Sequence, residues 1–89
     1  MFSSWGTETV SKYTTEEIEK ILCELDHAEE YGIVLRAKGI VALTDGNWAH
    51  FDYVPGEHNV RIGSAEITGK ICVIGSGLKE EKLPALFKI

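Results

Sequence analysis

A capped amphipathic helix that leads directly into a long apolar strand is the feature that most constrains this fold. Thr14 and Glu17 have the spacing of a capping box, in which each side chain bonds the other residue's backbone amide. Gly32 stands where a left-handed C-terminal cap is expected, and residues 33–43 follow it as an apolar strand. The apolar stripe of the helix consists of Ile18, Ile21, Leu22, Leu25 and Ala28. A helix with one such stripe must bury it, and a sheet that contains the following strand offers the surface.

Turn residues divide the rest of the chain. Asp45-Gly46 predicts a two-residue type I′ hairpin, with residues 47–54 as the returning strand. Pro55-Gly56 predicts a type II turn or a sharp bend. Residues 59–64 are then either a new strand or the same strand resumed.

Both ends of the chain also carry structural signals. Residues 2–13 suit a strand, with a bulge at Trp5 and Gly6. Residues 70–75 form a short apolar strand, and residues 80–88 form a terminal helix. Pro84 is compatible with that helix only within about its first turn, where the missing N–H costs little.

These elements predict an α+β fold with a single antiparallel sheet of about four strands. Two helices pack on one face, in the manner of a ferredoxin-like two-layer sandwich. With 89 residues, the chain has room for one domain, residues 1–89. Alternation along the strand 33–43 directs one set of side chains to the helices: Ile33, Leu35, Ala37, Gly39, Val41 and Leu43. The open face is expected to carry Arg36, Lys38, Trp48, His50 and Asp52.

Recognisable catalytic and cofactor motifs are missing from the sequence. No nucleophile and base form a known pattern, and Gly75-Ser76-Gly77 lacks the spacing of a phosphate-binding loop, so no catalytic or cofactor-binding residues are predicted. His50 and His58 flank the Pro55-Gly56 turn and are the candidates for a metal pair. No two His or Cys have a recognised ligand spacing, which favours ordinary surface histidines and predicts no tight metal binding.

Net charge and cysteine content limit the partners and the cellular compartment that we expect. The net charge of −5 argues against a nucleic-acid partner, because an acidic surface repels phosphates. No apolar run reaches the roughly 20 residues of a membrane span, and no leader peptide is visible. Cys23 and Cys72 lie in apolar contexts, which predicts reduced, buried thiols in a cytoplasmic protein.

The strand 34–41 carries a family resemblance. Arg36, Lys38 and Gly39 form an Arg-x-Lys-Gly run directly after a helix that ends in Gly32, and this run resembles the hallmark strand of the CobW C-terminal domain. The order of strands and turns from Phe2 to the acidic segment 80–83 is also similar, so the resemblance covers nearly the whole chain. Only Arg36, Lys38 and Gly39 match a family motif, and we interpret them as docking residues.

The resemblance implies a role but places no chemistry on this chain. CobW-family proteins are cytoplasmic P-loop GTPases that deliver zinc, cobalt or other metals, or act in cobalamin biosynthesis. Their phosphate loop, base-specificity motif and Cys-x-Cys-Cys motif are absent here, so GTP, Mg²⁺ and Zn²⁺ or Co²⁺ are implied only for the full-length family. The chain is expected to be a non-catalytic accessory domain whose partners are a GTPase domain, a metal-client protein or a second copy.

Two other functions stay open at the level of sequence. Trp48, with Arg36 and Lys38, could serve a single-stranded nucleic-acid binder of the open-sheet type. A regulatory domain for a small ligand is the third interpretation, and ligand-induced thermal stabilisation would reveal it.

Overall fold

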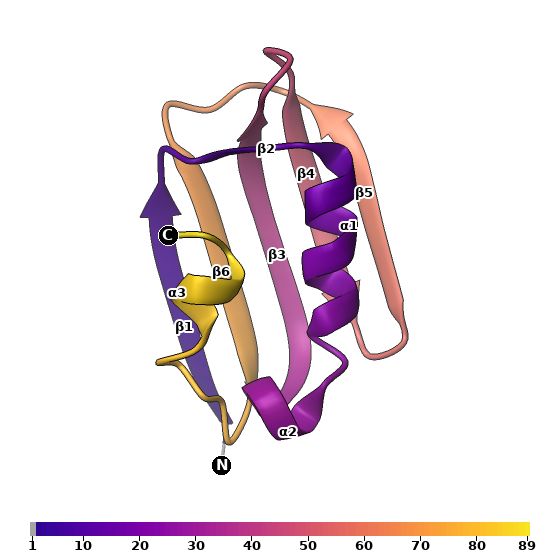
Figure 1. Cartoon of the computed structure of the whole chain (residues 1–89), viewed down its shortest axis with the longest axis vertical. Coiled ribbons are helices and arrows are strands. Elements are labelled where there is room, and N and C mark those ends of the chain that lie inside the picture. Colours follow the sequence, from indigo (N-terminus) through magenta and orange to yellow (C-terminus); the bar gives the residue numbers. More distant parts are fainter. Residues whose placement is uncertain (1) are drawn as a thin grey trace.

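The computed structural model describes residues 2–89, which form a six-stranded sheet with helices on one face only (Figure 1). The strands are β1 (Phe2–Thr9), β2 (Lys12–Tyr13), β3 (Ile33–Leu43), β4 (Trp48–Val54), β5 (Glu57–Gly63) and β6 (Gly69–Ser76). The helices are α1 (Thr15–Glu24), α2 (Ala28–Tyr31) and α3 (Leu83–Leu86). None of these helices has the length and apolar character that a membrane span requires.

The sheet is mainly antiparallel and wider than the sequence predicted. Its order is β1-β6-β3-β4-β5, and β2 adds a short parallel pairing with β3. The estimate of four strands was wrong because residues 2–13 divide into two strands and because β5 is a strand of its own after the Pro55-Gly56 turn. The α+β class is confirmed, whereas a ferredoxin-like arrangement is not. The bulge expected at Trp5 and Gly6 is also wrong, since β1 pairs with β6 residue by residue throughout.

The helix start follows the prediction, and the helix end does not. Thr14 N donates to Glu17 Oε1 at 2.8 Å and Glu17 N donates to Thr14 Oγ1 at 3.1 Å, which completes the capping box. The expected single helix breaks after Glu24 and resumes as α2. Asp26 lies in the break, where its carboxylate accepts hydrogen bonds from the Tyr53 hydroxyl and from Gly56 N at 3.2 Å. These bonds, with that from Tyr53 the more important, lower the pKa of Asp26 and tie the break to the β4–β5 hairpin.

The φ of Gly32 is positive, as the predicted left-handed cap requires, but its ψ lies outside the left-handed helical region, so the predicted cap type was wrong. Its φ is +86° and its ψ is −177°, a combination that is nearly restricted to glycine. A Cβ at this position would lie 2.2 Å from the Gly77 carbonyl oxygen. Gly32 therefore allows the chain to pass directly from α2 into β3 while its backbone lies close to Gly77, the residue after β6.

The β3–β4 hairpin differs from the predicted type I′ turn. Gly46 has a φ of +92°, but Asp45 does not have the positive φ that the first central residue of a type I′ turn needs. Leu43 N donates to Asn47 O at 2.8 Å, and Asn47 N donates to Asp45 Oδ1 at 2.9 Å. The connection is therefore a longer loop that ends in a left-handed glycine, and the Asp45 side chain supports it.

A bulge in β3 changes which residues enter the core. The register with β6 shifts between Val34 and Arg36, so Val34 is buried and Leu35 is exposed. The prediction that Ile33 and Leu35 face the helices was therefore wrong, because a bulge inserts one residue into the alternation. Beyond the bulge the predicted alternation holds. The buried positions of β3 after the bulge and of β4 are Ala37, Val41, Leu43, Ala49, Phe51 and Tyr53.

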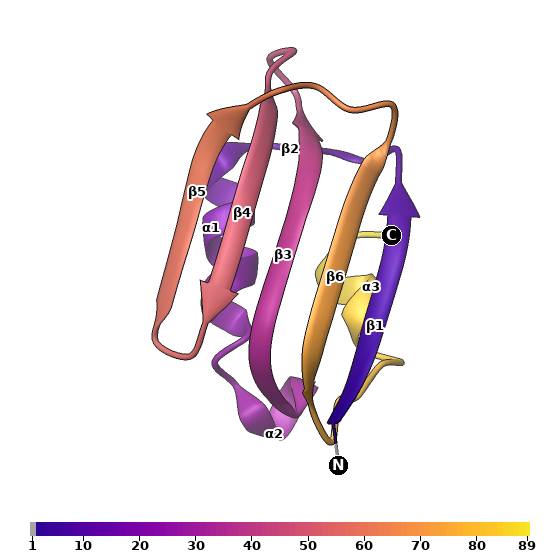
Figure 2. The same ribbon diagram turned by 180° about the vertical axis from the view of Figure 1, so that it is seen from behind.

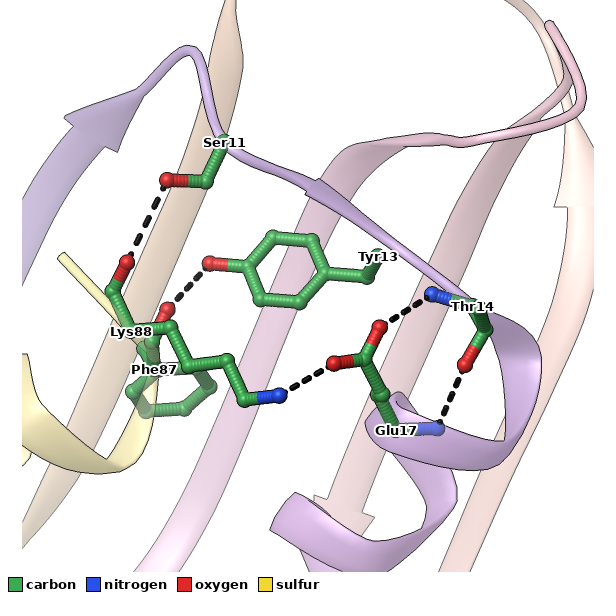
Figure 3. Close-up of polar contacts among 6 residues, drawn as sticks. All are labelled: Ser11, Tyr13, Thr14, Glu17, Phe87 and Lys88. Atoms are coloured by element: carbon green, nitrogen blue, oxygen red, sulfur yellow. Dashed lines mark hydrogen bonds and ion pairs between the residues drawn. The ribbon is translucent and has the colours of Figure 1, made fainter.

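The C-terminal segment lies over β6 and β1 (Figure 1), and Figure 3 shows its polar contacts with Tyr13 and Glu17. Phe87 is buried, and its ring stacks on Trp5 and Phe51 at centroid distances of 5.9 and 6.4 Å. The Tyr13 hydroxyl donates to Phe87 O, and Lys88 Nζ donates to the Glu17 carboxylate. The expected helix 80–88 is only the single turn α3, with Pro84 in its first turn as required.

Candidate functional site

The face of the sheet opposite the helices is uncovered. Figure 2 shows β5, β4, β3, β6 and β1 in front, with every helix behind them. Alternation along each strand directs every second side chain to this side. We call it the open face. The site is built on strands, so the positions of its residues are fixed by the ladder of backbone hydrogen bonds.

Four cationic residues gather on the open face. Arg36 and Lys38 come from β3 as predicted, Arg61 comes from β5, and Lys70 comes from β6. Together they line a shallow depression with a volume of about 680 Å³. Uncharged residues including Ile40 and Cys72, together with His50 and Asp52, complete much of its lining.

Asp52 is the one carboxylate in the lining of this depression. Its Oδ2 lies 3.0 Å from Arg61 Nη1, and its Oδ1 lies 3.9 Å from Arg36 Nη2. Within residues 2–89, neither Lys38 nor Lys70 has an ion-pair partner within 4.0 Å. Asp52 therefore partly compensates the two arginines and leaves the two lysines available.

The charges of the protein are separated between its surfaces. The lining of the depression carries four Lys or Arg and one Asp, an excess of three positive charges with His50 neutral. Since the whole chain has a net charge of −5, everything outside the depression carries −8. This local excess favours an anionic partner despite the acidic total.

Register places these residues in two rows across the sheet. One row runs Lys70, Ile40, His50, Arg61 from β6 to β5. The neighbouring row runs Cys72, Lys38, Asp52, Asn59. Ile40 is only partly buried and lies between Lys70 and His50, so an apolar residue stands among the charges.

The two candidate metal ligands do not meet. His50 is on the open face, where its Nε2 lies 2.9 Å from Ser64 O, whereas His58 lies on the helix side, with its Nε2 2.7 Å from Glu19 Oε2. Adjacent strands pair His50 with Arg61 and Tyr53 with His58, which sends the two histidines to opposite faces. Among residues 2–89, no group of three or more His, Cys, Asp or Glu is placed to hold a metal ion.

The remaining predicted residues divide between the two faces. Trp48 and Asp52 lie on the open face, as expected, and Trp48 is only partly exposed. Gly39 faces the core side, where a Cβ would lie 2.5 Å from Phe51 Cζ. Cys23 is exposed and Cys72 is partly exposed, so the prediction of buried thiols was wrong. Cys23 lies on the solvent side of α1, outside its apolar stripe.

Sequence reasoning missed Arg61 and Lys70. The Pro55-Gly56 turn pairs Val54 with Glu57, and counting back along both strands pairs His50 with Arg61. The position of Arg61 beside His50 could therefore have been predicted from the sequence. Lys70 could not be found in this way, because its position depends on β6 inserting between β1 and β3.

Comparison with known families identifies the domain. The family model for the cobalamin synthesis protein cobW C-terminal domain matches residues 2–88. The chain belongs to this family. The matched domain is the C-terminal one and is not the catalytic GTPase part of a CobW-family protein.

Two solved structures share the fold. One is the Zn(II)-bound YjiA GTPase from E. coli, with 23% identity and a TM-score of 0.76. The other is a Zn(II)-bound triple mutant of the YjiA GTPase, with 20% identity and a TM-score of 0.79. Each comparison covers 98% of this chain and 29% of the YjiA chain, so this chain spans less than a third of those proteins. A search of the curated proteins found no match.

Proposed function

We propose that this chain is a non-catalytic docking domain of a CobW-like GTPase that works in zinc or cobalt delivery or in cobalamin biosynthesis. The domain acts in the cytoplasm, and its open face contacts the GTPase domain, a metal-client protein or a second copy. Family membership supports the link to a GTPase, and the zinc in the YjiA structures supports the link to metals.

One observation carries the docking role: the cationic open face of a domain that is otherwise acidic. A sheet covered on both faces would have no such surface, whereas an antiparallel sheet can leave one face free. The cations contribute little to folding because they are exposed, and exposed ion pairs are worth about 0–1 kcal/mol. Their concentration around the depression is therefore better explained by contact with a partner than by stability.

The mechanism is mechanical coupling. A domain that holds its partner on a rigid sheet transmits movement of the GTPase domain only if binding differs between nucleotide states. GTP and a metal ion belong to the GTPase domain in this proposal. The residues of the open face supply orientation and charge.

A binding titration tests the proposal. The purified domain is titrated with the GTPase domain of a CobW-family protein from the same organism, in GTP-bound and GDP-bound forms, by calorimetry. We expect association that differs between the two nucleotide states. Absence of association in both states would contradict the docking role.

The variant Arg36→Ala/Lys38→Ala assigns the contact to the open face. We expect its unfolding free energy to change by less than about 1 kcal/mol, because both side chains are exposed. Its binding should weaken, and the loss should shrink at high salt because screening already removes the charge contribution. The matched control is Lys20→Ala/Lys82→Ala, two exposed lysines on the helix side that should leave binding unchanged. Equal binding by both variants would remove these residues from the interface.

Single-stranded nucleic acid is the second candidate, and one observation favours it: Trp48 and four cations share the open face. Such binders stack successive bases on aromatic residues. The lining of the depression includes Ile40 and Cys72 but not Trp48. We therefore favour a protein partner.

A further inference from the structure

The strongest unexplained feature of the open face is the arrangement of its free charges around aliphatic residues. Lys38 and Lys70 are exposed, stand on the neighbouring strands β3 and β6, and have no ion-pair partner within residues 2–89. Ile40 pairs directly with Lys70 in the ladder and lies two residues from Lys38 on the same face. Each lysine can therefore bind an anionic group of a partner while Ile40 contacts an apolar group.

The width of the surface limits the partner. The row from Lys70 to Arg61 crosses three strand spacings, which is about 14 Å at the usual spacing of about 4.8 Å. An α-helix with its side chains is about 10–12 Å in diameter, so one helix fits along this surface. Lys70 and Arg61 stand at the ends of this row with Ile40 and His50 between them, and Lys38 follows next to Ile40 in the neighbouring row. This arrangement matches a helix whose carboxylates flank an apolar stripe.

We propose that the open face binds an acidic amphipathic segment of a partner protein, with Lys38 and Lys70 receiving its carboxylates and Ile40 contacting its apolar side chains. This inference deepens the docking role proposed above and rests on it. The exposed Ile74 and Leu35 extend the apolar contact along β6 and β3. Arg36 and Arg61, which share Asp52, form the outer part of the same cationic surface.

Two features favour a protein over a nucleic acid. Ile40, the apolar side chain beside the lysines on this face, is aliphatic, and the Phe51 ring that also lines the depression is 2% exposed and belongs to the core, whereas sequence-tolerant binding of bases depends on aromatic stacking. Carboxylates also interrupt the cationic surface, because Asp52 lies within it and Glu8 is the neighbour of Lys70 in the β1–β6 ladder, although the two side chains form no ion pair within 4.0 Å. A continuous phosphate backbone would meet both carboxylates, whereas a folded acidic segment can place its charges over the lysines alone.

The test uses synthetic probes, so it does not depend on the GTPase domain. Fluorescence anisotropy at low salt measures binding of a labelled helical peptide with Glu residues on both sides of a Leu stripe. A second peptide replaces each Glu with Lys, a third replaces each Leu with Ala, and a fourth probe is a single-stranded thymidine oligonucleotide. We expect the Glu/Leu peptide to bind best, the Ala peptide more weakly, and the Lys peptide not at all.

Charge reversal locates the site. Lys38→Glu/Lys70→Glu should weaken binding of the Glu/Leu peptide by about tenfold or more, whereas the matched control Lys20→Glu/Lys82→Glu, on the helix side and with the same change in net charge, should retain most of it. Thermal melts of both variants confirm that the domain is folded. Equal losses in the two variants, failure of the Glu/Leu peptide to bind, or tighter binding of the oligonucleotide would overturn the inference.

Failure of this inference can be distinguished from failure of the proposed docking role. A domain that binds the GTPase domain equally well with and without Lys38→Glu/Lys70→Glu retains the docking role and refutes this inference. A domain that binds the acidic peptide through Lys38 and Lys70 but ignores the GTPase domain retains the acidic-segment site and refutes the proposed GTPase partner.

Discussion

A single methyl group added at Gly39 should destabilise the domain strongly. The Cβ of Gly39→Ala would lie 2.5 Å from Phe51 Cζ and 2.7 Å from the Lys70 carbonyl oxygen, closer than real Cβ contacts come. Phe51 cannot move aside easily, because it is 2% exposed and stacks on Phe87. The Lys70 carbonyl is part of the backbone of β6, which pairs directly with β3, so it cannot move without shifting the strand. Either the core or the sheet must therefore shift.

Overpacking of this kind costs about 1–3 kcal/mol in well-packed cores. For a domain of this size, each kcal/mol lowers the melting temperature by about 4–8 °C, so we expect a loss of roughly 5–20 °C. Gly39→Val, which adds two further methyl groups, should be worse. Thermal and urea unfolding followed by circular dichroism measure both quantities.

Gly6→Ala is the matched control for Gly39→Ala. Gly6 is also a strand glycine, but the nearest atom to its added Cβ is Ile71 O at 3.6 Å, an ordinary contact. The control should be neutral or stabilising by up to about 1 kcal/mol, since alanine restricts the unfolded chain more than glycine does. A Gly39→Ala protein as stable as its parent, or one indistinguishable from Gly6→Ala, would refute the packing argument.

Two further predictions concern the helix side. Asp26→Asn should lower stability near neutral pH by less than about 1 kcal/mol, because Asp26 is exposed and solvent weakens its bond to Tyr53. Folding lowers the pKa of Asp26, so its contribution to the free energy of unfolding is present above the unfolded pKa of about 3.9 and is lost as the pH falls through the lower folded pKa. Urea titrations from pH 7 to pH 2 should therefore show the stability difference between parent and variant shrinking below about pH 4. Phe87→Ala should cost about 3–5 kcal/mol in the same assay, because Phe87 is a buried aromatic side chain. Ile89→Ala, at a residue 49% exposed, should change stability little, and a similar loss in both variants would argue against a C-terminal closure of the core.

Local chemistry explains which elements the sequence predicts well. The capping box at Thr14 and Glu17 uses atoms three residues apart, so its pattern is sufficient to fix the helix start. The alternation of β4 is likewise local and was correct. The bulge near Leu35 depends on the register with β6, about forty residues later in the chain, and no nearby residue announces it.

The same distinction applies to the candidate site. Arg36, Lys38 and Asp52 lie on the open face because each follows the alternation of its own strand. Lys70 joins them only because β6 lies between β1 and β3, a neighbour relation that depends on the whole sheet. Alternation predicted that Gly39 faces the helices, yet the atoms closest to an added Cβ belong to Phe51 of β4 and Lys70 of β6. Its position in the core was predictable, whereas its partner was not.

The two faces of the sheet have different roles, since one packs against the helices and the other carries the proposed docking surface. Residues of the docking surface can therefore change without loss of the fold. The core lies between the sheet and the helices, so changes at Phe51 or Phe87 act on stability. The cations of the open face are exposed, and Asp52 between Arg36 and Arg61 reduces the repulsion that two neighbouring guanidinium groups would feel. Asp52→Asn should therefore have opposing effects on binding: it raises the positive charge available to an acidic partner while releasing the two arginines from their shared anchor. Because long-range attraction governs association and fixed geometry governs dissociation, we expect this variant to bind an acidic partner faster and to release it faster.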